Sequence, residues 1–196
     1  MSDDLDWPLE DRQEGEDLIL FRARYDMRRH PRTREVMKRI VLESVDWVNV
    51  VALTGDDQCV MIRQFRFGVG YTTLEVPGGM VDPGEDPLTA ARRELAEETG
   101  YSGGRWHYLG AVEPNPAVHD NLCHHFLAED VCRNAGQSLS GGEEIRLEVM
   151  PRTRVIEAAR GGEIKHALAL SALSRVFSLW PLPFVQDGEQ ASDNRG

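Results

Sequence analysis

The chain has 196 residues, of which 41% are hydrophobic and 28% charged, and its formal net charge is −11. This composition suits a globular protein with one good core, and the acidic balance, without a basic stripe, argues against a nucleic-acid polymer as partner. We expect a cytoplasmic protein with no membrane partner, because no apolar run approaches a membrane span, the start MSDDLDW is unlike a signal peptide, and the three cysteines lack a CxxC spacing.

The first 45 residues are predicted to form a segment apart from the main domain. Residues 1–17 are acidic and poor in apolar side chains, so we expect them to be mostly disordered. Residues 18–28 and 36–43 partly alternate between apolar and polar side chains, which predicts two antiparallel strands. Because a two-stranded ribbon is marginal alone, it must pack on something. A second copy of this chain is the candidate, which predicts a homodimer.

A main domain is predicted over residues 46–185, followed by a polar tail at 186–196 that we expect to be disordered. Residues 46–53 and 58–66 are β-prone runs on either side of a Gly-Asp-Asp turn, and they predict a hairpin. Trp47 lies in the first of these strands. It is a candidate platform for stacking a base, and burial at the junction with the N-terminal strands explains it equally well.

The stretch between residues 79 and 101 predicts a helix with a defined start and stop. Asp86 suits the N-cap, where its side chain can accept from an unpaired backbone N–H. Pro87 suits the first helical position, and Gly100 suits the left-handed residue after the last turn. The helix is therefore expected over residues 87–99.

Three glutamates of this helix lie at the edge of its apolar face. At about 100° per residue, Glu94, Glu97 and Glu98 fall within an arc of roughly 100°. Like charges at this edge repel each other, and a bound divalent cation would remove the conflict; hard oxygen ligands favour Mg²⁺, with Mn²⁺ as the substitute. A charged surface helix with Arg92 and Arg93 as salt-bridge partners explains the same spacing.

Two further strands are expected beyond this helix, over residues 106–112 and 121–128. The loop between them is rich in proline, and its Asn115 is a candidate for binding a sugar or for shaping the turn. The run Cys123-His124-His125 has the composition of a metal site. Because neighbouring strand residues point to opposite faces, the three side chains cannot converge, and no zinc is expected.

The last third of the chain is predicted to hold one strand and two helices. Residues 138–149 read as a Gly-Gly turn that leads through two glutamates into a strand. Residues 153–160 fit a short helix, and residues 163–180 fit a second helix with a wide apolar face. His166, near the start of the second helix, is expected to make a structural polar contact.

The helix and the turn before it resemble the Nudix box with every defining position filled. Gly79 is followed after five residues by Glu85, and after seven more by the run RELAEETGY at 93–101. The resemblance implies a hydrolase of nucleoside diphosphates linked to another moiety that uses divalent cations. It also implies an α+β fold, the Nudix α/β/α sandwich with a mixed sheet, to which this chain adds its N-terminal antiparallel ribbon.

Within the box, the resemblance assigns a role to each charged residue. Glu94 and Glu98 would bind the metal, and Glu97 would bind it or assist catalysis. Arg93 would orient the carboxylates, and Glu85 would brace the loop through an ion pair with Arg93. With the whole box matched, the interpretation as a plain surface helix loses most of its weight.

Outside the box, residues 59–85 resemble the branch of the family that cleaves ADP-ribose and other nucleoside diphosphate sugars. By that resemblance, Arg66 and Glu75 would contact substrate or help hold the metal–phosphate cluster; taken alone, Arg66 reads as a surface charge at a strand end. The Gly78 carbonyl would be a further metal ligand.

A late glutamate completes the implied site, because the branch delivers one from a flexible loop to bind metal or position the attacking water. Glu143 is the better match and Glu144 the alternate, while a solvated acidic turn explains both residues without function. Pro116, about fifteen residues beyond the box, matches a mark of ADP-ribose pyrophosphatases.

The sequence therefore predicts a Mg²⁺-dependent pyrophosphohydrolase that cleaves ADP-ribose or another nucleoside diphosphate sugar to a nucleoside monophosphate and a sugar phosphate. One alternative is a hydrolase of dinucleoside polyphosphates, and another is a sensor that binds a nucleotide sugar without cleaving it. The intact glutamates of the box argue against the sensor. No motif indicates which base or sugar is preferred.

Overall fold

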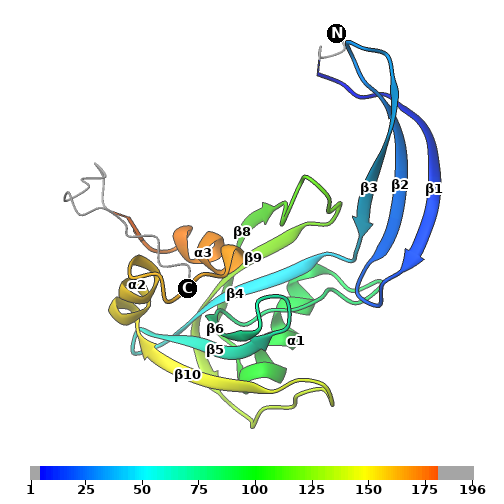
Figure 1. Cartoon of the computed structure of the whole chain (residues 1–196). Helices are drawn as coiled ribbons and strands as arrows, with labels where there is room; N and C mark the ends of the chain where they lie inside the picture. The colour runs from blue at the N-terminus through cyan, green and yellow to red at the C-terminus, as the bar shows by residue number, and fades with distance from the viewer. Residues whose placement is uncertain (1–4, 181–196) are drawn as a thin grey trace.

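A computed structural model describes residues 5–180, and the tail predicted at 186–196 lies outside the described residues. A mixed seven-stranded sheet with three helices forms the main body, and a three-stranded antiparallel sheet projects from it (Figure 1). This is the expected α+β fold. The elements in chain order are β1 (Leu9–Asp17), β2 (Arg22–Arg29), β3 (Val36–Glu43), β4 (Trp47–Thr54), β5 (Gln58–Arg66), β6 (Tyr71–Glu75), α1 (Pro87–Thr99), β7 (Tyr101–Ser102), β8 (Arg105–Val112), β9 (Cys123–Arg133), β10 (Ile145–Pro151), α2 (Arg152–Arg160) and α3 (Ala167–Ser174).

Strand β4 lies at the centre of the main sheet, whose order is β10-β5-β4-β9-β7. It pairs in parallel with β9 and antiparallel with β5, so the predicted hairpin is confirmed. Alternate residues of β4 serve opposite faces: Val48, Val50 and Ala52 pack with α1, whereas Val51 and Leu53 pack with α2 and α3. A strand buried on both faces needs this near-continuous apolar run.

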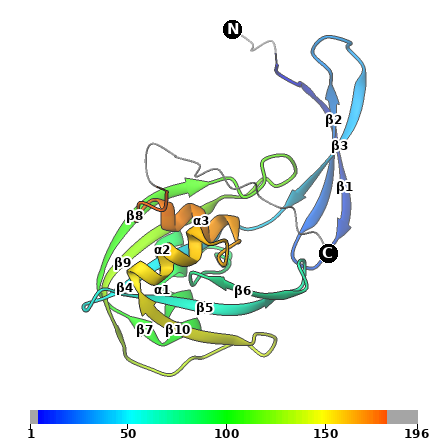
Figure 2. The ribbon, with the colours of Figure 1, turned by 60° about the vertical axis from the view of Figure 1, so that its left-hand side comes forward.

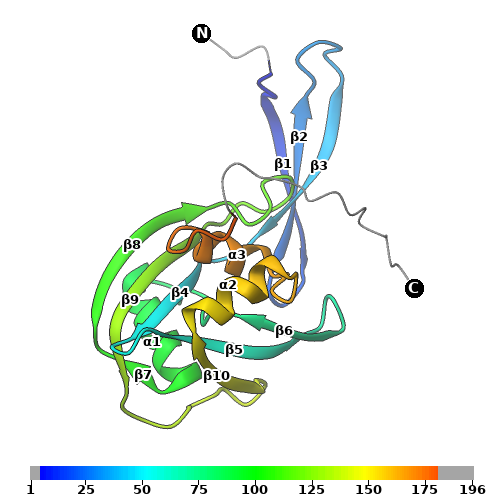
Figure 3. The same cartoon turned by 90° about the vertical axis from the view of Figure 1, so that its left-hand side faces the viewer.

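The helices consequently cover the two faces of the sheet, with α2 and α3 on one side and α1 on the other (Figures 2 and 3). Helix α1 has the predicted ends. The Asp86 side chain accepts from the backbone N–H groups of Leu88 and Thr89, and Gly100 adopts a φ of 75°. Among residues 5–180, no helix is both long and apolar enough to span a membrane.

The prediction for the N-terminal segment was wrong in one respect, because residues 9–17 form strand β1 and make the ribbon a three-stranded sheet. Ion pairs between its side chains centre on one buried carboxylate. Asp26 on β2 is 1% exposed and receives hydrogen bonds from Arg12, Arg24 and Arg28 at 2.7–3.1 Å. A composition-based expectation of disorder misses such a paired, charged strand.

The last helix is shorter than the expected 163–180, because α3 occupies only Ala167–Ser174. His166 ends the irregular segment before it and caps the helix, its Nδ1 accepting from the Ala169 N–H at 3.3 Å. After α3 the chain turns and buries Phe177 and Leu179 in the core. The apolar pattern of residues 163–180 thus predicted their contact with the core correctly, but it predicted too long a helix.

Candidate active site

Glu98, in the last turn of α1, is the most buried carboxylate of the box, with 4% of its surface exposed. Its Oε2 accepts a hydrogen bond of 2.9 Å from the backbone N–H of Gly78. Burial raises the pKa of Glu98 to about 8, and the negative charges of Glu94 and Glu143 add to the increase. Ionised Glu98 therefore lacks sufficient positive charge around it.

Glu94 lies one turn earlier on α1 and packs against the backbone of Gly79. A Cβ at Gly79 would lie 2.4 Å from Glu94 Oε1, so a larger residue would displace this carboxylate from its present position. Burial raises the pKa of Glu94, although Arg93 opposes the increase through a 2.8 Å hydrogen bond. Glycine at the first box position thus lets the Glu94 carboxylate lie against the backbone.

Arg93 binds the charged residues of the box to each other. Its guanidinium donates to both carboxylate oxygens of Glu85, at 2.9 and 3.2 Å, so the expected ion pair is present. It also donates to Glu94, to Glu97 at 3.2 Å and to the carbonyl of Met80 at 2.9 Å. The side chain of Glu97 is 46% exposed, against 13% for Glu94, and therefore faces solvent more than its neighbours.

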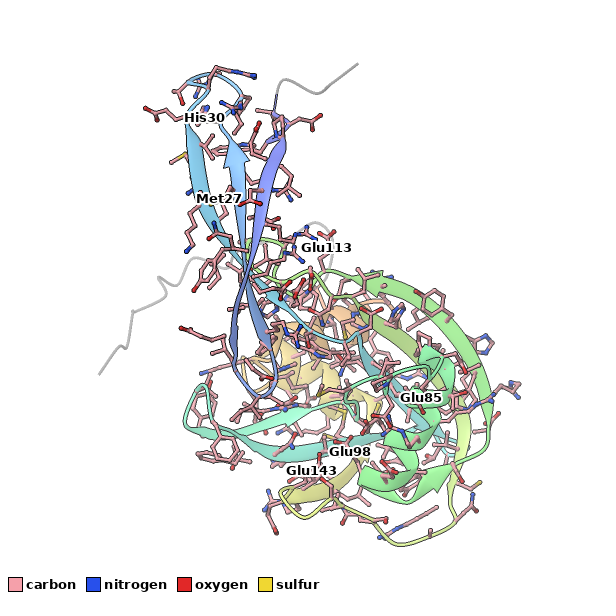
Figure 4. All side chains as sticks on the ribbon, turned by 90° about the vertical axis from the view of Figure 1, so that its right-hand side faces the viewer. Met27, His30, Glu85, Glu98, Glu113 and Glu143 are labelled. Atoms are coloured by element: carbon pink, nitrogen blue, oxygen red, sulfur yellow. The ribbon has the colours of Figure 1, made fainter. Side chains whose placement is uncertain are left out.

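Glu143 comes to the box from the connection between β9 and β10. It interacts electrostatically with Glu94 and Glu98, and Figure 4 shows it beside Glu98. Its Oε2 accepts from the backbone N–H of Ser140 at 3.2 Å. A residue 45 positions after Glu98 is thus placed with the box carboxylates, as the sequence suggested.

Arg66 and Glu75 form a bidentate ion pair on the neighbouring strands β5 and β6, with both N–O distances at 2.8 Å. Glu75 is 1% exposed. Burial opposes its ionisation, yet the hydrogen bonds and charge of Arg66 hold its pKa below the usual value. Thr73 also donates to Glu75, and His166 Nε2 lies 3.7 Å from it. Arg66 is therefore more than a strand-end surface charge.

A cavity of about 380 Å³ lies beside these groups, between the main sheet and the turn that joins β1 to β2. Trp47 lies at the junction with the N-terminal sheet, with ring contacts to Phe21 and His119, and it also lines the cavity. Trp47 thus lies at the expected junction, and its stacking on a base stays a prediction. The lining includes Leu20, Phe21, Trp47, Arg66, Val69, Gly78, Gly79, His166 and Leu168.

Two of the residues that surround the site were missed by sequence reasoning. Phe21 reaches the cavity from the turn between β1 and β2, and nothing local in the sequence indicates that approach. Thr73 could have been found, because residues two apart on a strand share a face and Thr73 precedes Glu75 by two.

Asn115 has the turn-forming role. Its side-chain oxygen accepts from Ala117 N–H, and its carbonyl accepts from the N–H groups of Val118 and His119. In the Cys123–His125 run, the three side chains bond to Asn49, Asp46 and Ser171 respectively. Each of these neighbours thus has its own partner.

The carboxylates offer the oxygen donors that a divalent cation prefers, but their present orientations do not converge on one ion. Among residues 5–180, no three His, Cys, Asp or Glu side chains are placed to hold one ion as they stand. Glu94 is turned toward Arg93 and Glu143 toward Ser140. An all-oxygen donor set whose buried member has a raised pKa nevertheless suits Mg²⁺, since a cation would supply the missing positive charge.

Comparison with known proteins agrees with this geometry. The model of the NUDIX domain matches residues 45–170. An ADP-ribose pyrophosphatase of Mycobacterium tuberculosis is 30% identical over 164 residues, which cover 82% of this chain and 78% of that protein. An ADP-ribose pyrophosphatase of Bacillus subtilis is 36% identical over 94 residues, 48% of this chain and 51% of that protein.

The solved structure of an ADP compounds hydrolase has the same fold. It superposes with a TM-score of 0.75 at 20% identity, covering 87% of this chain and 91% of the other. The chain thus aligns with about half the length of the Bacillus subtilis relative and with most of this structure. The matched NUDIX region contains the box, Arg66, Glu75 and Glu143, and the chain belongs to the Nudix family.

Proposed function

We propose that this protein is a Mg²⁺-dependent pyrophosphohydrolase that cleaves ADP-ribose or another nucleoside diphosphate sugar. The products are a nucleoside monophosphate and a sugar phosphate. The observation that carries the proposal is the buried, charge-deficient Glu98, bonded to Gly78 in the wall of a cavity that Arg66, the partner of Glu75, also lines. The relatives named ADP-ribose pyrophosphatase support the choice of substrate.

In this proposal Glu94, Glu98, Glu143 and the Gly78 carbonyl would hold the metal. The cation would supply positive charge for the diphosphate and acidity for the attacking water. Arg93 keeps Glu94 and Glu97 in place from one side. Either Glu97, which faces solvent, or Glu143 accepts the proton of the attacking water.

The cavity wall orients the rest of the substrate. Arg66 offers positive charge to a phosphate, and its pairing with buried Glu75 fixes the guanidinium plane. Trp47 and Phe21 present aromatic surface to a base or ribose. A volume of about 380 Å³ suits part of a nucleotide sugar, the remainder lying toward the metal ligands.

We also propose that the protein is a homodimer and that it acts in the cytoplasm. The N-terminal sheet supports the dimer. This sheet extends away from the main body (Figure 1). A groove of about 1030 Å³ is lined by the sheet and by the loop at residues 116–120. Light scattering on the full chain is expected to give twice 22.1 kDa. A monomer at micromolar concentration would contradict this.

The test of the activity is a substrate panel with Mg²⁺ and with Mn²⁺. ADP-ribose, UDP-glucose, GDP-mannose, NADH and diadenosine polyphosphates are incubated with the protein, and the released products are separated by chromatography. We expect ADP-ribose or another diphosphate sugar to be turned over fastest. Preferred cleavage of diadenosine polyphosphates would replace the substrate class, and binding without turnover of any member would indicate a sensor.

A further inference from the structure

The connection between β9 and β10, residues 134–144, carries Glu143 but contains no helix or strand. Two side-chain amides fix it to the body. Asn134 Nδ2 donates to Ser102 Oγ at 2.8 Å. Gln137 Nε2 donates to two backbone carbonyls, that of Glu98 at 2.7 Å and that of Ile145 at 3.0 Å.

The two acceptors of Gln137 belong to the segments that present the carboxylates. The Glu98 carbonyl is among the last four of α1, which have no partner within the helix. Ile145 begins β10, two residues after Glu143. At the other end of the loop, Ser138 N–H donates to the Glu97 carbonyl at 2.8 Å. Both ends of the segment 138–144 are thereby fastened to the C-terminal turn of α1.

This fastening restrains a flexible segment. The chain between the two attachments contains Gly141 and Gly142, whose backbones can adopt many conformations. An amide supplies two N–H donors without net charge. An arginine or lysine in its place would hold the carbonyls too, but it would also compete with a metal for the carboxylates.

We propose that Gln137 is a positioning residue for the reaction: by joining the carbonyls of Glu98 and Ile145, it holds the Glu143 carboxylate within reach of the metal bound by Glu98. It acts through Glu143 and need not touch metal or substrate. The inference rests on the proposed function, because it assumes that Glu143 serves the metal or the attacking water.

The test compares Gln137→Met, which keeps the length of the side chain and removes its donors, with Asn134→Leu, which removes the amide at the other attachment. Activity is measured against Mg²⁺ concentration and against substrate. We expect Gln137→Met to raise the half-saturating Mg²⁺ concentration about 10-fold to 100-fold, the scale for groups that orient metal ligands. The KM at saturating Mg²⁺ should stay within about 2-fold, and Asn134→Leu should resemble the wild type. Equal behaviour of the two variants would overturn the proposal.

A second measurement separates positioning from general stability. Gln137→Met combined with Glu143→Gln should be no worse than Glu143→Gln alone by more than about 2-fold, since Gln137 acts through Glu143. Effects that multiply would overturn the proposal, as would an unchanged Mg²⁺ requirement in Glu143→Gln.

Hydrogen exchange distinguishes failure of this inference from failure of the proposed function. In the full-length protein, amides of residues 138–144 should exchange faster in Gln137→Met, while those of β4 stay protected. Unchanged exchange would overturn the proposal even in an active enzyme. If the wild type turns over no substrate, the hydrolase function fails and the reaction role of Gln137 fails with it, whereas faster exchange would still establish the tether.

Discussion

Two buried carboxylates, one on a strand of the N-terminal sheet and one on helix α1 of the main domain, meet opposite surroundings. Asp26 in the N-terminal sheet is 1% exposed and Glu98 in the main domain is 4% exposed. Burial opposes the ionisation of Asp26, but hydrogen bonds from Arg28 and Arg12 outweigh it and lower its pKa. Burial of Glu98 raises its pKa to about 8, and its carboxylate neighbours add to the rise.

The difference teaches how to separate a structural acid from a functional one. The protein supplies its own cations to Asp26, which makes that carboxylate part of the framework. It gives Glu98 one backbone N–H and leaves the charge uncompensated, a cost that a folded protein tolerates where a ligand brings the compensation. In the proposed function, Mg²⁺ supplies the positive charge that the side chains around Glu98 do not provide.

Breaking the Asp26 cluster should have the largest effect. Asp26→Ala removes the shared acceptor of three arginines, including Arg24, which is 8% exposed. We expect the free energy of unfolding to fall by about 3–5 kcal/mol, the scale for breaking a buried ion pair. Urea unfolding measures it, with Asp11→Ala on exposed β1 as the control. A loss below about 1 kcal/mol would show that the cluster is not structural.

Glu98→Gln should reduce activity, because it changes the carboxylate that we assign to the metal. The amide keeps the shape of the side chain and removes its charge, so kcat/KM at saturating Mg²⁺ should fall about 100-fold to 1000-fold, as when one stabilising group is lost at a reaction centre. The steady-state rate with ADP-ribose measures the loss. Glu157→Gln, on the exposed side of α2, should leave the rate within about 2-fold. Full activity of Glu98→Gln would refute its role as a metal ligand.

The two carboxylates should also give opposite pH dependences of stability. Without metal, folded Glu98 has a pKa of about 8 against 4.5 in the solvent-exposed unfolded chain, so wild type loses stability relative to Glu98→Gln as pH rises from 4.5 to 8. The difference is expected to reach about 4 kcal/mol near pH 8 in EDTA and to vanish below pH 4.5.

Asp26 behaves in the reverse sense. Its folded pKa lies below the unfolded value of 3.8, so its stabilisation is fully present above that pH and is lost as pH falls through the folded pKa. Urea unfolding across pH 3–8 would follow both effects. Parallel curves for wild type and Glu98→Gln would contradict the Glu98 assignment.

Gly79→Ala should produce the smallest of these effects. The new Cβ would lie 2.4 Å from Glu94 Oε1 and push this carboxylate from its place. We expect the half-saturating Mg²⁺ concentration to rise about 10-fold, the lower end for disturbed metal ligands. Gly141→Ala, where the Cβ meets nothing within 4 Å, is the matched control. Equal Mg²⁺ titrations for the two variants would show that the space is not needed.

Local chemistry explains which features the sequence could predict. The ends of α1 were predictable because Asp86 and Gly100 act on their own turn. Strand β1 was not, since its support is the Asp26 cluster, which brings together arginines from two strands. The start of α3 depends on capping by His166, a residue that is seldom an N-cap.

The site divides in the same way. The box fixes Glu94, Glu97 and Glu98 by helical spacing, so their grouping could be predicted. The tether of the Glu143 loop through Gln137 depends on two backbone carbonyls that only the folded chain brings together. Likewise, Phe21 reaches the cavity from another sheet, and no periodicity in its own segment indicates that approach.

The parallel pairing of β4 with β9 also has a consequence for synthesis on the ribosome. Trp47 pairs with Cys123 and Thr54 with Val131, so the centre of the sheet joins segments made far apart in time. Helix α1 lies between them in the chain and packs on β4. Until β9 has emerged from the ribosome, β4 therefore lacks its parallel neighbour. Helix α1 is the first helix that can cover the apolar side chains of β4.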